Sequence, residues 1–405
     1  SDTTLALLKV LNDIHSSTDN TSKRKPTIGF YIDLSKAYDT ISHSKLIEKL
    51  ETEFNFTADT VKFFKSYLQN RQQETHTQHA KSTSQTITHG IPQGSTLSTT
   101  LFLLYINNIT KTVPNSTVYT YADDTTLLIT ADSIEELQKH AQNELDNLIK
   151  YFHLNNLVPN PTKTVYTLFY PTTTQQDDLT FKMTNTTTLE KETTNFKKII
   201  IKYTTTLQHT DSAKLLGTSI QRNLKQHSNI SNIVKKLQPV IQMLRYATTL
   251  LPTQYMIRLY YTFVYPHLIG AISVWGTRDS TAQYMQPLRI THKKIVRIIC
   301  NQPPRTHTAP LMDKHCILDL EKLYTLRVST EMHPYIHPNK KTKHRPPTER
   351  PPICNCYRGS RTRHTLLQKQ HVHSKHKQIL KNTTTNPHKH PLRTITHQHL
   401  EQTTN

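Results

Sequence analysis

The sequence predicts an α+β fold, and two kinds of pattern lead to that class. Short apolar runs rich in aromatic and β-branched residues, such as 27–32 and 118–130, have the composition of buried strands. Longer segments, such as 134–152 and 230–244, repeat apolar residues every three or four positions, as helices with one buried face do. A chain of 405 residues has room for one large core or two to three smaller ones.

The first elements of the chain are a strand and two helices. Residues 27–39 (TIGFYIDLSKAYD) begin as a buried strand and turn polar, as a strand does at a sheet edge. Residues 43–54 place leucine and isoleucine at helical spacing, which predicts a helix. Residues 89–109 open as a turn around Gly90 and Gly94 and continue as an apolar helix.

The middle of the chain predicts a hairpin, a long helix and a polar insertion. In residues 118–130 (VYTYADDTTLLIT), two acids stand between two apolar runs, so we expect a hairpin with the acids at its bend. Ser133 and Glu136 form a capping box, and the helix that follows buries one apolar stripe. Residues 170–195 are rich in threonine and weakly periodic, which predicts a hairpin or a surface insertion.

The C-terminal half predicts helices and then a tail. Strand character extends to Ile220, and helical patterns dominate up to about Arg327. From Met332 to Leu400 the only acid is Glu349, among many Lys, Arg, His and Pro residues. We expect a basic, partly disordered tail there. Its Cys354, Cys356 and His364 fit no standard zinc-ligand spacing, so its expected role is electrostatic.

The overall charge predicts a polyanionic partner. The chain has 50 Lys and Arg residues against 29 Asp and Glu, a formal charge of +21 and a pI near 9.7. Nucleic acid is the first choice, because phosphate neutralisation releases counterions, although an anionic membrane surface would also suit the charge. Residues 259–276 approach membrane-span length, but Pro266 and His267 interrupt them, so we expect buried helices and no membrane partner.

Cysteine content predicts the cellular compartment, and the N-terminal residues predict that the chain is part of a longer protein. Four cysteines are too few for a disulfide framework in a chain of this length, which favours a reducing, intracellular compartment, either nucleus or cytoplasm. The first residues contain no initiator Met and no secretory leader, so we expect a piece of a longer protein.

Three acids are candidates for metal ligands. Asp33 ends one predicted strand, and Asp123 and Asp124 stand at the predicted hairpin. Brought side by side, three carboxylates repel one another unless cations neutralise them, and ligation by oxygen alone suits Mg²⁺ or Mn²⁺. Neighbouring side chains of a strand point to opposite faces, so one of the two adjacent acids should be the stronger ligand. Taken alone, the Asp pair could equally be an ordinary turn.

The Asp pair is one of three motifs that together resemble a known family. In chain order, FYIDLSKAYDTISH (30–43), HGIPQGSTLSTTLFLLYINNI (89–109) and YADDTTLLI (121–129) resemble motifs A, B and C of reverse transcriptases. The three motifs are most similar to those of non-LTR (LINE-type, jockey-like) retrotransposons, and further similarity extends over about residues 1–330. Where this family usually has Ser-Pro, the chain has Ser98 and Thr99, and we expect the threonine to alter the geometry of this helical turn modestly.

The resemblance implies roles for individual residues. Asp33 and Asp123 would bind the catalytic Mg²⁺ or Mn²⁺ ions, with Asp124 as the accessory acid. Tyr38 matches the aromatic position that excludes a 2′-hydroxyl and so favours deoxynucleotides. Lys163 matches a lysine near the leaving pyrophosphate, where it would donate a proton or balance charge.

Other matched residues would contact the nucleotide or the nucleic acid. The family's loop between template base and nucleotide corresponds to Gly90, Pro92, Gln93 and Gly94. Of these, Gln93 and Gly94 would lie against the nucleotide, and Gln93 would also reach the template strand. Lys65 and Arg71 are weaker candidates for contacts with backbone phosphates. Asp39 is expected to fix the turn after motif A.

The resemblance implies a right-hand polymerase fold with partial fingers, an antiparallel palm sheet backed by helices, and a helical thumb. Its expected division is 1–26 (lead-in of the fingers), 27–222 (palm with partial fingers), 223–330 (thumb and connection) and 331–405 (tail). The implied activity is RNA-directed DNA synthesis, a nucleotidyl transfer from dNTPs to a DNA primer on template RNA; protein partners stay unknown. The alternatives are an inactive nucleic-acid-binding remnant and a host-domesticated or intron-type enzyme with a role in splicing.

Overall fold

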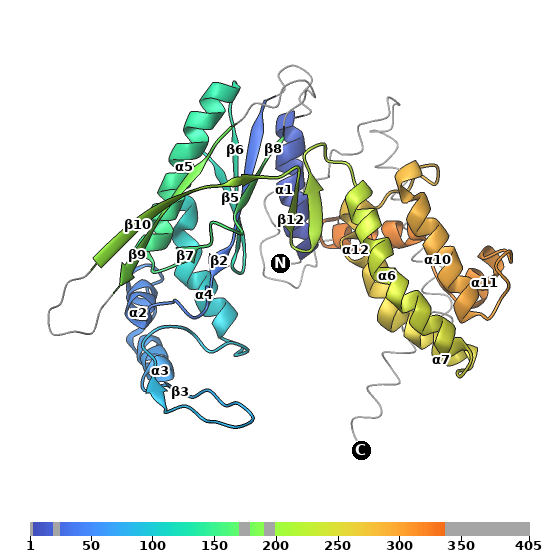
Figure 1. The fold of residues 1–405 in the computed structure, drawn as a ribbon, viewed down its shortest axis with the longest axis horizontal. Helices are drawn as coiled ribbons and strands as arrows, with labels where there is room; N and C mark the ends of the chain where they lie inside the picture. Colours follow the sequence, from blue (N-terminus) through green and yellow to red (C-terminus); the bar gives the residue numbers. More distant parts are fainter. Residues whose placement is uncertain (1–2, 19–24, 170–178, 190–198, 337–405) are drawn as a thin grey trace. The chain divides into compact units, whose positions relative to one another are not determined.

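The computed structural model describes residues 3–18, 25–169, 179–189 and 199–336 (Figure 1). The chain folds into two compact units, Ser1–Gln226 and His227–Asn405, and each is described by itself. The predicted tail lies outside the described residues except for 331–336, which belong to the last helix. The three tail residues considered for a metal therefore lie outside them too.

A five-stranded sheet is the centre of the first unit. Its strands are β11 (Gln208–His209), β8 (Val165–Phe169), β1 (Thr27–Ile32), β6 (Asp124–Thr130) and β5 (Thr117–Tyr121), in that order. All neighbouring strands pair antiparallel except β11 and β8, which are parallel. With the helices that cover it, this sheet confirms the predicted α+β fold and its antiparallel sheet backed by helices.

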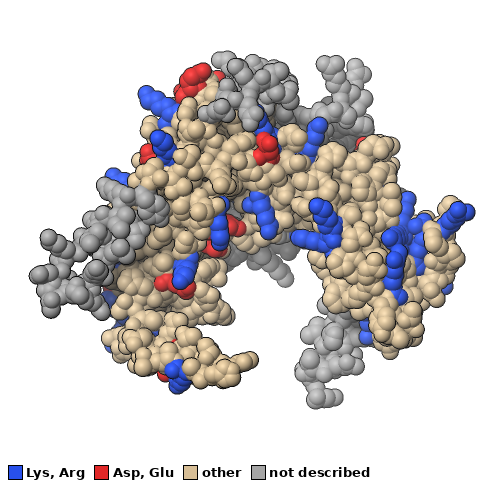
Figure 2. Space-filling model, in the orientation of Figure 1, with Lys and Arg blue, Asp and Glu red and all other residues tan. Residues whose placement is uncertain are grey.

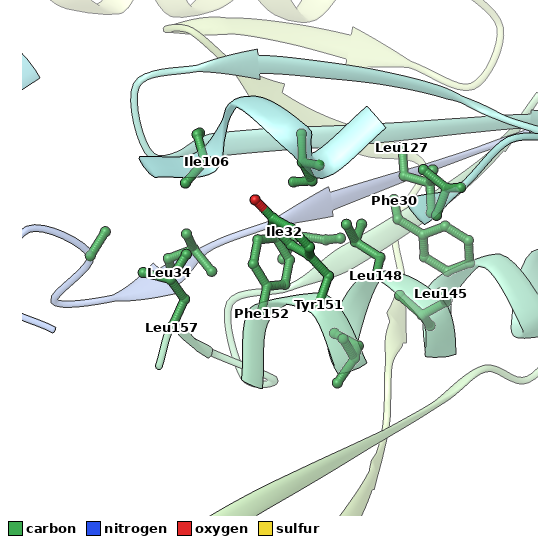
Figure 3. Close-up of a cluster of buried hydrophobic side chains, with 14 of the residues drawn as sticks. Phe30, Ile32, Leu34, Ile106, Leu127, Leu145, Leu148, Tyr151, Phe152 and Leu157 are labelled. Carbon is green, nitrogen blue, oxygen red and sulfur yellow. The ribbon is translucent and has the colours of Figure 1, made fainter. Parts of the chain in front are cut away.

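One face of the sheet carries the main core of the unit. Helix α5 (Ile134–Leu154) crosses this face, and α4 (Ser98–Ile106) packs beside it (Figure 3). Alternate residues of β1, among them Phe30 and Ile32, point toward α5 and meet Leu148 and Phe152. One of the two hydrogen bonds of the capping box predicted for α5 is present: the Glu136 N–H donates to Ser133 Oγ at 3.2 Å.

Helix α1 (Thr3–Thr18) covers the opposite face of the sheet, a helix that we did not predict from the sequence (Figure 1). Its buried residues are Thr4, Leu7, Val10, Leu11, Ile14 and His15. Tyr119 of β5 hydrogen-bonds Asp13 of this helix, and Gly29 leaves space on β1 between Leu128 and Phe169. The sheet is thus buried on both faces, which explains why β1 reads as a continuous apolar run.

The elements between β1 and α4 form one end of the unit. They are β2 (Leu34–Ser35), α2 (His43–Thr52), α3 (Ala58–Leu68), β3 (Gln72–Gln73) and β4 (Gln85–Thr86). Strand β2 pairs with β7 (Val158–Pro159), which follows α5, and so fixes the residues just after β1. A short 3₁₀ helix, Asn107–Thr112, continues α4.

Two hairpins complete the first unit. The threonine-rich segment contributes β9 (Lys182–Leu189), which pairs with β10 (Ile199–Thr206). A hairpin is therefore present, but its second strand lies beyond the predicted 170–195. Phe181 and Met183 are buried in the core beside α5, which a surface insertion would not show. The second hairpin joins β12 (Ser212–Leu215) to β13 (Thr218–Gln221).

The second unit is helical in its described part, as predicted. Its helices are α6 (His227–Thr248), α7 (Thr253–Leu259), α8 (Tyr265–Ile269), α9 (Ile272–Trp275), α10 (Gln286–Ile299), α11 (Ala309–Lys314) and α12 (Leu320–Ile336). Residues 259–276 fold into short helical pieces around buried Tyr260, Leu268 and Trp275. No helix within the described residues is both long and apolar enough to cross a membrane.

Candidate active site

The hairpin of β5 and β6 carries the adjacent acids at its tip, as the sequence predicted. Tyr121 pairs with Asp124, and Ala122 and Asp123 form the turn between them. Ala122 makes this tight reversal with a left-handed φ of 52°. Asp124 begins β6 and Asp123 precedes it, so the two carboxylates leave the backbone at different angles.

The sheet register brings Asp33 to the same place. Ile32, the last residue of β1, stands opposite Thr125 of β6. Continued by one residue, this register sets Asp33 beside Asp124. The backbone of Asp33 is held on its other side, where its carbonyl accepts from the Asn160 N–H at 2.8 Å and its N–H donates to Thr164 Oγ1 at 3.4 Å.

The three acids influence one another electrostatically. Partial desolvation at the end of the hairpin, and then the carboxylates of Asp123 and Asp33, raise the pKa of Asp124 above its ordinary value. Asp33 has a cationic neighbour, because Lys163 Nζ lies 3.6 Å from its Oδ2. Both side chains of this ion pair are substantially exposed to solvent, which limits its contribution to stability.

The donor set suits a hard divalent cation by its chemistry. Carboxylate oxygens are the ligands that Mg²⁺ and Mn²⁺ prefer. Desolvation is the larger cause of the raised pKa of Asp124, and the repulsion from Asp123 and Asp33 that adds to it is what such a cation would relieve. Among the described residues, no three His, Cys, Asp or Glu side chains stand in a ready ligating arrangement. Asp33, Asp123 and Asp124 are therefore neighbours whose three carboxylates do not converge on one point in this structure.

A pocket of about 500 Å³ opens beside the hairpin tip. Its lining residues come from the segment after β1, the loop before α4, the start of α4 and the hairpin: Leu34, Lys36, Ala37, Tyr38, Gln93, Gly94, Ser95, Ser98, Thr99 and Asp123. The pocket thus brings together four residues that the sequence singled out from three separate segments. Its volume is within the range of small-molecule sites.

Tyr38 lines this pocket with a half-buried side chain. Its ring stacks on Phe102 of α4, with ring centroids 4.9 Å apart and planes 25° from parallel. Phe102 is fully buried, so the tyrosine ring is backed by the core and has little freedom to move away.

The loop before α4 is fastened to the turn after β1. The Gly90 N–H donates to the Ile41 carbonyl at 2.7 Å, and the Ile91 N–H donates to the Tyr38 carbonyl at 2.9 Å. Gly90 has a φ of 88°, and a Cβ there would stand 3.0 Å from the Asp39 carbonyl oxygen. The close approach that requires this glycine is therefore to the protein's own backbone.

Gln93 and Gly94 take different positions in that loop. Gln93 Nε2 donates to Asp39 Oδ1 at 3.0 Å, so the Asp39 side chain binds across to the loop as well as shaping the turn. Gly94 has a φ of 81° and no heavy atom within 4 Å of where its Cβ would be. Its backbone conformation calls for glycine, and the space beside it is open to the pocket.

The other predicted site residues do not line the pocket: Asp33, Lys65, Arg71, Gly90, Pro92, Asp124 and Lys163. Pro92 lies in the loop, where its carbonyl accepts a hydrogen bond from the Ser98 hydroxyl. Lys65 of α3 pairs with Glu51 at 2.8 Å, and Arg71 packs over the Tyr67 ring at 4.6 Å. The two predicted phosphate contacts are thus occupied within the protein, and their role toward nucleic acid stays a prediction.

Sequence reasoning missed several residues of the site. Lys36, Ser95, Ser98 and Thr99 line the pocket, and His43 Nε2 lies 2.6 Å from the Gly90 carbonyl oxygen. Lys36 lies within motif A, between Asp33 and Tyr38, so its place in that motif is the signal that could have singled it out. The resemblance singles out Ser98 and Thr99 only as the place where the family has Ser-Pro, with no role in binding. Ser95 carries no such signal, since the sequence around it is rich in serine and threonine.

Comparison with known proteins points in one direction. Residues 7–220 match the family described as reverse transcriptase (RNA-dependent DNA polymerase). The chain is 23% identical over 288 residues to the RNA-directed DNA polymerase from mobile element jockey of Drosophila melanogaster, covering 68% of this chain and 28% of that protein. It is 25% identical over 260 residues to a probable RNA-directed DNA polymerase from transposon BS of the same species, covering 61% and 26%.

Among solved structures, the chain is similar to telomerase from Candida albicans, with a TM-score of 0.41 and 11% identity over 77% of this chain and 53% of that one. The chain spans less than a third of the length of the curated relatives it matches. The family match covers more than half of the chain, including the acids, the pocket and the sheet that carries them. This chain belongs to the reverse transcriptase family.

Proposed function

We propose that this chain catalyses RNA-directed DNA synthesis of the non-LTR retrotransposon kind, transferring deoxynucleotides from dNTPs to the 3′-hydroxyl of a DNA primer on template RNA. The proposal concerns the segment in hand, because it matches less than a third of the length of each jockey relative. The observation that carries it is the meeting of Asp123, Tyr38, Gln93 and Gly94 in one pocket, beside an acid that the sheet register sets at the end of β1.

Metal dependence follows from the family and from the donor set. Reverse transcriptases depend on divalent metal ions, and we propose that Asp33 and Asp123 hold Mg²⁺ or Mn²⁺ here, with Asp124 assisting. When bound, such ions supply electrostatic stabilisation to the attacking and leaving oxygens of an in-line displacement. The carboxylates themselves orient and hold these ions, and their different backbone positions make them unequal in strength.

The pocket supports a nucleotide of the deoxy series. A ring backed by the buried Phe102 cannot retreat from an additional 2′-oxygen, which supports the proposed role of Tyr38 in excluding ribonucleotides. The open space beside Gly94 lets a sugar approach the backbone. Gln93 would contact the nucleotide through its amide oxygen while its Nε2 stays on Asp39.

We propose that Lys163 acts at the leaving group. Its ammonium lies 3.6 Å from Asp33 and is exposed, so it has the reach to turn from that carboxylate toward a pyrophosphate. An ammonium there would donate a proton or balance the charge that develops on the leaving oxygen. The net charge of +21 supports binding of the template and primer through their phosphates.

We assign the palm and the thumb to the two compact units of the chain. The palm with partial fingers would occupy 27–222 after a lead-in of 1–26, and the thumb and connection would occupy 223–330. The boundary between the two units after Gln226 supports a change of role near that point. The face drawn in Figure 2 has many Lys and Arg side chains and few acids around α10 and α11, which supports a nucleic-acid contact by the second unit.

Primer extension tests the proposal. The chain is incubated with poly(rA)/oligo(dT), dTTP and Mg²⁺ or Mn²⁺, in parallel with the Asp123→Asn variant. We expect extension by the wild type and at least a thousandfold loss in the variant, because electrostatic stabilisation of the transition state is lost. If both proteins bind the primer and template equally and neither extends the primer, the chain is an inactive binding remnant and the proposal is wrong.

A further inference from the structure

Lys36 is a cation that lines the pocket. It lies in the turn after β2, three residues beyond Asp33 and two before Tyr38. Within the part of the chain that the structure describes, its ammonium pairs with no carboxylate, whereas Lys163 pairs with Asp33. The Lys36 side chain is exposed, so it does not contribute to the packing of a core.

The backbone of Lys36 has a strained conformation. Its φ is 48°, in the left-handed region where residues with a Cβ are strained and where glycine and asparagine are preferred. The turn enforces this conformation, because the Lys36 carbonyl accepts from the N–H groups of Asp39 at 2.9 Å and Thr40 at 3.2 Å. The turn therefore holds the Lys36 backbone in a fixed position, from which the exposed side chain borders the pocket.

The surroundings of Lys36 indicate what it would bind. Among the residues that line the pocket, Lys36 is the only cation and Asp123 the only acid. The remaining polar side chains carry hydroxyls and one amide, which hydrogen-bond anions without balancing their charge: Tyr38, Gln93, Ser95, Ser98 and Thr99. A ligand with a polar sugar and a strongly anionic end matches this distribution.

We propose that the Lys36 ammonium binds the triphosphate of the incoming nucleotide, opposite the sugar that Tyr38 and Gly94 contact. This inference rests on the proposed polymerase function and adds to it the residue that holds the substrate's charge. A lysine offers a flexible, hydrated point charge that suits a phosphate chain whose geometry changes as the reaction proceeds. The other phosphate source is the nucleic-acid backbone, and the two sources make different kinetic predictions.

The experiment compares four proteins in primer extension at varied dTTP concentration: wild type, Lys36→Asn, Lys36→Arg and the control Lys139→Asn, which changes an exposed lysine of α5. We expect Lys36→Asn to raise the KM for dTTP about tenfold or more, since a charge-assisted contact is lost. Lys36→Arg should stay within about threefold of wild type, because it keeps the charge. The control should match wild type.

Two further measurements separate this role from others. The melting temperature of Lys36→Asn should equal that of wild type or exceed it by up to about 3 °C, because asparagine suits the left-handed backbone. Its Kd for the primer and template should be unchanged. An unchanged KM for dTTP, or a weakened Kd for nucleic acid with an unchanged KM, would overturn the proposal.

Failure of the polymerase proposal is distinguishable from failure of this one. If the wild type extends no primer, equilibrium dialysis of labelled dTTP with Mg²⁺ reports binding without catalysis. Binding by wild type and the control that is about tenfold weaker in Lys36→Asn would still support the role of Lys36. Equal binding by all four proteins, or no binding by wild type, would refute it.

Discussion

The Gln93 side-chain amide donates a hydrogen bond to the Asp39 carboxylate at 3.0 Å, which joins the loop before α4 to the turn after β2. Lys36 and Tyr38 lie in that turn, and Gln93 and Gly94 lie in that loop, so this bond connects two walls of the pocket. Together with the two backbone hydrogen bonds made by Gly90 and Ile91, it sets the width of the site.

Removing this acceptor should loosen the nucleotide site. We expect Asp39→Ala to raise the KM for dTTP about three- to tenfold, because the loop loses one hydrogen bond to a charged group. Asp39→Asn retains an acceptor oxygen at the same position and should stay within about twofold of wild type. Steady-state primer extension measures both, and an Asn variant as impaired as the Ala variant would show that charge, and not the hydrogen bond, is what matters.

The two glycines of the loop should respond differently to alanine. At Gly94 only the positive φ opposes a side chain, so Gly94→Ala should cost about 1 kcal/mol of stability in the first unit. At Gly90 the new Cβ would also press on the Asp39 backbone, so Gly90→Ala should cost about 3 kcal/mol. Hydrogen exchange of peptides from β1, followed by mass spectrometry, reports these losses, and equal protection in the two variants would contradict the close approach.

The sequence predicts those parts of this fold that depend on local pattern. The acid-bearing hairpin, the α5 stripe and the glycine loop follow from spacing and turn chemistry, and the structure contains all three. Helix α1 could have been predicted in the same way, because its buried Leu7, Val10 and Ile14 stand at helical spacing, but the resemblance assigns this segment only to a lead-in. The Lys36 backbone and the Gln93–Asp39 bond depend on tertiary contacts that no local pattern encodes.

The buried His292 should make the second unit sensitive to acid. Desolvation lowers its pKa to about 4, although Asp319 acts in the opposite direction, and its Nε2 lies 2.9 Å from the Tyr260 hydroxyl oxygen. The unfolded chain, with an ordinary pKa near 6.5, binds this proton more readily than the folded one. Stability contributed by neutral His292 is therefore present above pH 6.5 and is lost as the pH falls from there toward 4.

Urea unfolding followed by fluorescence measures this effect. Trp275 is the single tryptophan of the chain and is buried in the second unit, so its emission reports this unit alone. We expect the free energy of unfolding to fall by about 2 kcal/mol between pH 7 and pH 5 in wild type. His292→Gln should lack most of that slope, since glutamine bonds Tyr260 without titrating; an identical slope in both proteins would exclude His292 as its source.

Lys163 should affect the rate of chemistry more than nucleotide binding. Its ammonium lies beside Asp33, away from the residues that line the pocket, so Lys163→Gln should lower the single-turnover rate about tenfold or more. The KM for dTTP should change less than threefold. Lys139→Gln serves as the matched surface control, and a selective rise in KM with an unchanged rate would place Lys163 in binding instead.

The proposed mechanism depends above all on Asp33 and Asp123, far apart in sequence, holding the same divalent ions. Iron-mediated cleavage tests this directly: Fe²⁺ replaces Mg²⁺ in the presence of dTTP and primer–template, and ascorbate with peroxide cuts the backbone near the bound metal. We expect cuts at both 32–34 and 122–124 in wild type, and loss of both in Asp123→Asn. Cleavage at only one of these segments, or cleavage near 33 that persists in the variant, would contradict a shared metal site.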